Sequence, residues 1–129
     1  MKGYVTNIEQ ETLKNENFRT VLYTSPHIQL VVMSVETEIG TETHKDTDQF
    51  IRVEKGSGKA ILNGQEHALQ EGSIVVIPAG IEHNIVNTGD TPLKLYTIYA
   101  PPHHKDGTVH TTKEEAEQGE EHFDGVTSE

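Results

Sequence analysis

The chain has 129 residues, enough for one domain, and only 33% of them are hydrophobic. It contains no cysteine, which excludes disulfides, thiolate nucleophiles and cysteine-ligated zinc or iron–sulfur sites. Its formal net charge of −11 argues against nucleic acid and anionic membrane surfaces as partners. The first residues lack the apolar core of a signal peptide, and no apolar run is long enough to span a bilayer, so we expect a cytoplasmic protein.

The apolar residues before residue 101 fall in short, β-branched runs that predict strands. No long segment before residue 100 shows the helical period. Asn63 and Gly64 tolerate positive φ angles, so they predict a tight hairpin between two of these strands. The expected strands cover residues 28–35, 50–53, 59–62, 66–69, 74–77 and 93–100.

Turn signals separate these runs at nearly regular spacing. Residues 56–58 (Gly-Ser-Gly) predict a turn or a β-bulge, and residues 87–92 are rich in Asn, Gly, Asp and Pro, which favour turns. Roughly seven to nine short strands with turns between them are typical of a sandwich or a jelly-roll barrel. We therefore predict an all-β fold.

The chain changes character after the last predicted strand. Residues 101–107 form a polar, proline-containing connector. After it, Thr111 with Glu114, or Thr112 with Glu115, would form a capping box at the start of a short helix. We predict a barrel domain over residues 1–102 and a polar, acidic C-terminal tail with a short helix over residues 103–129.

The most informative segment reads GSIVVIPAGIEHNIVN and is punctuated by Gly72, Pro78, Gly80, His83 and Asn87. An apolar strand stops at a Pro-Ala-Gly turn, and the returning strand carries one histidine. This segment resembles the second signature motif of the cupin superfamily at every fixed position. In that family the histidine of this motif is usually a metal ligand.

An upstream segment resembles the first cupin motif in spacing only. Glu42, His44, Gln49 and Gly56 keep the family's spacing. However, Glu42 stands in the position of the first histidine, and Gln49 stands in the position of the glutamate. Glu36 occupies a position where the family tends to have glycine.

The resemblance covers about residues 36–87, and the flanking strands extend it to about residue 100. It implies a small, single-domain bacterial cupin with a jelly-roll β-barrel and a divalent metal. Carried over by position, the metal ligands are Glu42, His44, Gln49 and His83. This set of nitrogen and oxygen ligands suits Mn, Fe, Co, Ni or Zn, and the sequence does not choose among them.

The spacing of these ligands has consequences for the strands that carry them. Glu42 and His44 are two residues apart, so they would share one face of a strand. Gln49 rejoins that face only if the chain bends between Lys45 and Asp48. Asp48 is an alternative to Gln49, because the family also tolerates a three-residue gap at this point.

The remaining residues of the motifs have structural interpretations. Gly56, Gly72, Pro78 and Gly80 set turns in either case, and we expect Asn87 to satisfy backbone groups at a turn. Six further histidines are expected to be exposed: His27, His67, His103, His104, His110 and His122.

Two functions fit this sequence. The first is an enzyme that acts on a small, polar, oxygenated molecule by isomerase- or dioxygenase-like chemistry at the metal, and the second is a non-catalytic binding or sensor cupin. No catalytic residue is assigned, although Glu82, Tyr96 or Tyr99 could reach a pocket. Arginine is scarce, which argues against a phosphate-bearing substrate. By analogy with the fold, we expect a homodimer that binds a small molecule.

Overall fold

The computed structural model describes residues 1–119 and 121–129. In these residues, nine strands form the all-β fold that the strand pattern predicted, and two short helices accompany them. The strands are β1 (Arg19–Thr24), β2 (Gln29–Val35), β3 (Asp48–Lys55), β4 (Gly58–Leu62), β5 (Gln65–Leu69), β6 (Ile74–Ile77), β7 (His83–Asn87), β8 (Leu93–Ala100) and β9 (Val109–His110). The helices are α1 (Ile8–Lys14) and α2 (Lys113–Gln118). Neither helix is long and apolar enough to cross a membrane.

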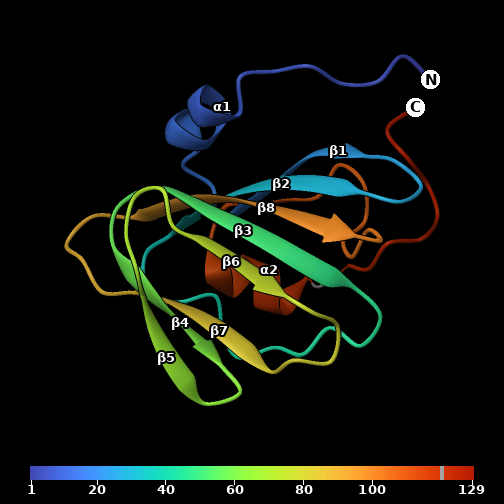
Figure 1. Cartoon of the computed structure of the whole chain (residues 1–129). Helices are drawn as coiled ribbons and strands as arrows, with labels where there is room; N and C mark the ends of the chain where they lie inside the picture. The colour runs from blue at the N-terminus through green and yellow to red at the C-terminus, as the bar shows by residue number, and fades with distance from the viewer. Residues whose placement is uncertain (120) are drawn as a thin grey trace.

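The strands form two antiparallel sheets that face each other (Figure 1). The larger sheet has the order β6-β3-β8-β2-β1-β9, and the smaller sheet has the order β5-β4-β7. Alternate residues of each strand point inward, so β8 buries Leu93, Leu95, Thr97 and Tyr99 and leaves the residues between them half-buried. This arrangement is the jelly-roll architecture that the sequence predicted, with the apolar core between the sheets.

The predicted hairpin forms at Asn63 and Gly64. Their φ angles are +48° and +82°, so both residues occupy the left-handed region that a two-residue turn requires. Leu62 therefore pairs directly with Gln65, and strands β4 and β5 keep a continuous register. This hairpin follows from local sequence alone.

Helix α1 was not predicted. It has seven residues, too few for its apolar spacing to be recognised in the sequence. Asn7 caps it by accepting a hydrogen bond from the Gln10 backbone N–H, and the Thr12 side chain is fully buried. The helix lies on the larger sheet, away from the smaller one (Figure 1).

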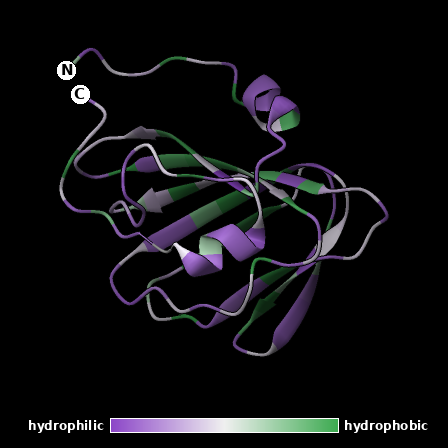
Figure 2. Ribbon diagram, turned by 180° about the vertical axis from the view of Figure 1, so that it is seen from behind, coloured by the Kyte–Doolittle hydropathy of each residue, from purple (hydrophilic) through white to green (hydrophobic). Residues whose placement is uncertain are grey.

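The C-terminal segment packs against the barrel. Strand β9 extends the larger sheet by pairing Arg19 with His110, and α2 follows it. Thr112 caps α2 by accepting from the Glu115 backbone N–H, which selects the second of the two predicted capping pairs. Figure 2 shows that α2 lies across the opening between the two sheets. The division into a domain and a tail at residue 102 stays a prediction.

Candidate metal centre

The two sequence motifs meet through their backbones at the opening between the sheets. The Glu42 N–H donates to the His83 carbonyl (2.8 Å), and the His83 N–H donates to the Glu42 carbonyl (2.9 Å). The Gly80 N–H, in the Pro-Ala-Gly turn, donates to the His44 carbonyl (2.8 Å). Gly80 has a φ of +88°, which favours glycine at this position. The turn of the second motif thus fixes the chain of the first.

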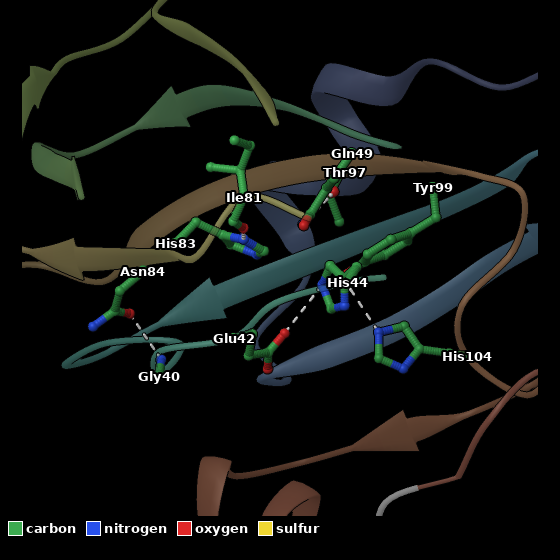
Figure 3. Close-up of polar contacts among 10 residues, drawn as sticks. All are labelled: Gly40, Glu42, His44, Gln49, Ile81, His83, Asn84, Thr97, Tyr99 and His104. Carbon is green, nitrogen blue, oxygen red and sulfur yellow. Dashed lines mark hydrogen bonds and ion pairs between the residues drawn. The ribbon is translucent and has the colours of Figure 1, made fainter. Parts of the chain in front are cut away.

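Three predicted ligands converge at this point. Glu42, His44 and His83 each offer a ligand atom, and these atoms lie within 4.8 Å of one another. The ring centroids of His44 and His83 are 5.0 Å apart, and His44 Nε2 lies 3.2 Å from a Glu42 carboxylate oxygen (Figure 3). Both rings are buried, whereas the Glu42 side chain is about one-third exposed. The site is therefore enclosed on the histidine side and open on the Glu42 side.

His83 is held with one nitrogen available. Its Nδ1 lies 2.8 Å from the Ile81 carbonyl, which can only accept, so Nδ1 carries the proton. The other nitrogen, Nε2, is then unprotonated in the neutral ring and can bind a cation. A backbone carbonyl that fixes the tautomer in this way is typical of metal-binding histidines.

The bend that Gln49 requires is present at residues 45–46. Gln49 then enters β3 with its side chain buried, and its Nε2 donates to the Thr97 hydroxyl (3.0 Å). Its Oε1 is buried and has no hydrogen-bond partner among the described residues. Asp48 instead is exposed and accepts from the Ala79 backbone N–H (2.8 Å). Of the two alternatives, only Gln49 turns a ligand atom inward.

The neighbouring groups shift the ionisation of two of these residues. Burial by itself would raise the pKa of the Glu42 carboxyl, but His44, followed by the charges of Arg19 and His103, outweighs it and the pKa is lowered. Burial lowers the pKa of His83, although the hydrogen bond to the Ile81 carbonyl opposes this shift. A carboxylate beside a neutral imidazole is the state in which such groups bind metals.

Two more histidines line the site, and the prediction that they are exposed was wrong. The His103 ring is half-buried with its centroid 4.1 Å from that of His44, and His104 is buried with its Nε2 3.3 Å from the Tyr99 hydroxyl. The Gln29 side chain holds both by accepting from their backbone N–H groups (3.2 and 2.9 Å). Burial lowers the pKa of His103 to about 4.

The other exposure predictions had mixed outcomes. His27, His67 and His122 are exposed as expected. His110 is buried, because β9 joins the sheet, so that prediction was wrong. Asn87 satisfies backbone groups as predicted, since its Nδ2 donates to the carbonyls of Val35, Glu36 and Thr91.

The three residues suggested as proton-transfer groups, Glu82, Tyr96 and Tyr99, differ in whether they face the barrel interior. Tyr96 is on the outer face of β8 beside Phe50, and Glu82 is exposed. Tyr99 points inward, with its ring centroid 5.8 Å from that of His44, and burial raises the pKa of its hydroxyl strongly. Of these three, Tyr99 alone lies beside the metal-ligand candidates.

Comparison with known proteins agrees with this geometry. The family model described as "Cupin domain" matches residues 29–99, more than half of the chain. The chain is a cupin. Among its relatives, YrkC of Bacillus subtilis is 47% identical over 129 residues, covering 93% of this chain and 69% of YrkC. L612 of Acanthamoeba polyphaga mimivirus is 48% identical over 112 residues, covering 82% of this chain and 70% of L612.

A solved structure supports the same assignment. The crystal structure of BH2720 from Bacillus halodurans superposes with a TM-score of 0.89 at 43% identity, covering 92% of this cupin and 96% of that chain. The family match covers residues 29–99 only. Because the superposition covers 92% of the chain, the structural similarity extends beyond this range on both sides.

The residues present in this cupin fit a metal ion. The Gln49 Oε1 atom is buried without a hydrogen-bond partner among the described residues, and His44 Nε2 is buried with the Glu42 carboxylate oxygen 3.2 Å away. Buried polar atoms normally have partners, so the unpaired oxygen of Gln49, a predicted ligand, calls for one. One carboxylate, two imidazoles and an amide oxygen form a set that divalent first-row metals accept.

Proposed function

We propose that this cupin binds one divalent transition metal, Mn, Fe, Co, Ni or Zn, through Glu42, His44, His83 and Gln49. The observation that carries the proposal is the convergence of the first three ligand atoms within 4.8 Å, with His83 Nε2 left free by the Ile81 carbonyl. The buried, unpaired Oε1 of Gln49 supports it.

We further propose that the metal serves an enzyme acting on a small, polar, oxygenated molecule by isomerase- or dioxygenase-like chemistry. A bound divalent metal would supply an electrophile for a substrate oxygen. The cavity on the open side of Glu42 has a volume of about 90 Å³, which suits a small molecule. His103 lines this cavity together with Glu42, so its imidazole would lie beside a substrate bound there.

Substitution of the ligands tests the metal site. We expect Glu42→Ala, His44→Ala and His83→Ala each to lower metal uptake on Mn²⁺ or Zn²⁺ titration well below one ion per chain, with the thermal unfolding of the metal-free protein still cooperative. His67→Ala, on the exposed face of β5, is the matched control and should bind like the wild type. Wild-type uptake by His83→Ala would overturn the assignment.

The alternative is a non-catalytic cupin that binds or senses a small molecule. A catalytic site should turn over a substrate only in the metal-loaded protein, whereas a binding module should bind ligand without product. The homodimer and the cytoplasmic location remain part of the proposal. Light scattering after size-exclusion chromatography tests the dimer, which a monomer mass would contradict.

A further inference from the structure

Arg19, on β1, is a buried cation without a counter-charge. Its side chain is 6% exposed. Its Nη1 donates to His110 Nδ1 (3.3 Å), its guanidinium carbon lies 5.2 Å from the Phe18 ring centroid, and its Nε has no hydrogen-bond partner. Among the ion pairs of the described residues, none includes Arg19. A guanidinium stays charged when buried, and a buried charge without a partner costs several kcal/mol.

The fold fixes this cation in place. Strand β9 pairs with β1 so that His110 stands opposite Arg19. Because arginine can only donate, His110 Nδ1 must accept, and His110 is therefore held as the Nε2–H tautomer. The guanidinium is thus oriented by a neutral neighbour, with which it forms no ion pair.

The nearby carboxylates have other partners. Glu42 lies beside His44 (3.2 Å), in the proposed metal set. Glu117, on α2, pairs with Lys113 (3.4 Å), so this lysine already has an anionic partner. Of Arg19 and Lys113, Arg19 is therefore the one that lacks an anionic partner among the described residues.

Arg19 lines the cavity next to the metal site. The cavity lies under α2, and its walls include Phe18, Arg19, Ile39, Glu42, His103 and His104. Because Glu42 belongs both to these walls and to the metal set, a ligand held at Arg19 would lie next to the metal ligands.

We propose that Arg19 binds the carboxylate group of the ligand, so that the substrate class is small organic acids with a second oxygen function. This inference rests on the proposed function and narrows it. A planar guanidinium matches a carboxylate with two parallel hydrogen bonds. A single arginine, with Glu42 and Glu117 nearby and a cavity of about 90 Å³, favours a monoanion over phosphate.

Calorimetric binding of matched acids and amides tests this inference. The probes are glycolate and lactate, their neutral amides glycolamide and lactamide, and inorganic phosphate, each with metal-free and Mn²⁺-loaded protein. We expect the wild type to bind at least one of the two acids about tenfold or more tightly than its amide and than phosphate. Arg19→Gln should lose that preference with its Mn²⁺ stoichiometry unchanged.

The controls separate charge from folding. Arg52→Gln removes the other arginine, which is exposed and pairs with Glu54 (2.8 Å), and should bind like the wild type. Arg19→Lys keeps the charge but loses the planar fork, so it should retain part of the preference. The wild-type comparison of acid with amide needs no variant, and it decides the matter if Arg19→Gln does not fold.

The outcomes distinguish this inference from the proposed function. Equal affinity for acid and amide, no binding of either acid, tighter binding of phosphate, or unchanged acid binding in a folded Arg19→Gln protein would overturn the carboxylate subsite. A metal-free protein that binds the acids through Arg19 but takes up no metal would overturn the metal site and leave the subsite standing.

Discussion

Gln49 and Glu42 are the two residues that separate this candidate site from the usual cupin ligand set. If both residues bind the metal, Glu42 is the one acidic ligand, so the carboxylate lies at position 42 instead of position 49 and the number of charged ligands is unchanged. The orphaned Oε1 of Gln49 and its bond to Thr97 indicate a side chain oriented to accept from, or coordinate, a ligand that lies inside the barrel.

Removing that oxygen should weaken metal binding. We expect Gln49→Leu to lower Mn²⁺ affinity about tenfold or more, because the substitution removes the amide oxygen and keeps a side chain of similar volume. Asp48→Asn, at the exposed neighbouring residue, should change it little. A metal titration followed by calorimetry measures both, and a Gln49→Leu protein with wild-type affinity would remove Gln49 from the ligand set.

His104 should make stability depend on pH. Burial, followed by the charge of Arg19, lowers its pKa far below the ordinary value of 6.5, so the folded protein holds it neutral. Below pH 6.5 the unfolded chain binds a proton that the folded chain does not, so this contribution is intact above pH 6.5 and is lost as the pH falls. At a pH of about 5.5 the loss is about 1.4 kcal/mol.

Urea unfolding at neutral pH and at a pH of about 5.5 measures this loss. We expect His104→Gln to lose about 1.2 kcal/mol less than the wild type between the two pH values, since about 0.2 kcal/mol of the loss is already present at pH 7. His67→Gln, at an exposed position, should follow the wild type. A His104→Gln protein with the wild-type pH dependence would show that His104 does not cause it.

At the scale of elements, Gly58 sets how closely β4 approaches its neighbours. A Cβ at this position would lie 2.5 Å from the Val86 carbonyl oxygen and 2.9 Å from Leu93 Cδ2. Gly58 pairs with Asn87 of β7, at the opposite end of this strand pair from Leu62 and His83, so the close approach bears on the packing of the smaller sheet.

Gly58→Ala should therefore be costly. We expect a loss of about 1–3 kcal/mol in the free energy of unfolding, because the backbone of Val86 cannot move away without distorting the sheet. Gly119→Ala is the control, since its Cβ would meet its nearest atom at 3.5 Å. Equal stabilities of the two variants in urea would contradict the steric argument.

Local elements were the most predictable part of the fold. The Asn63–Gly64 turn and the strands before residue 101 follow from residues close in sequence. The bend at residues 45–46 was required by the spacing of the first motif. Helix α1 was missed because seven residues carry little periodic signal.

At the scale of the whole molecule, the open side of the site is built by contacts between distant parts of the chain. Arg19 comes from the first strand, whereas His103 and His104 come from the segment after the last long strand. They meet because β9 pairs with β1 and because Gln29 binds the backbone at 103–104. No local pattern encodes such pairing, which is why the motifs indicated the candidate metal ligands but not the cavity beside them.

The metal content of the wild-type protein tests the central claim most directly. It should be measured by elemental analysis of protein prepared without nickel affinity resin or chelators, followed by titration with Mn²⁺ and Zn²⁺. We predict close to one divalent transition metal per chain, either as isolated or after titration. Protein that contains no metal and takes up none would contradict the metal centre at Glu42, His44 and His83.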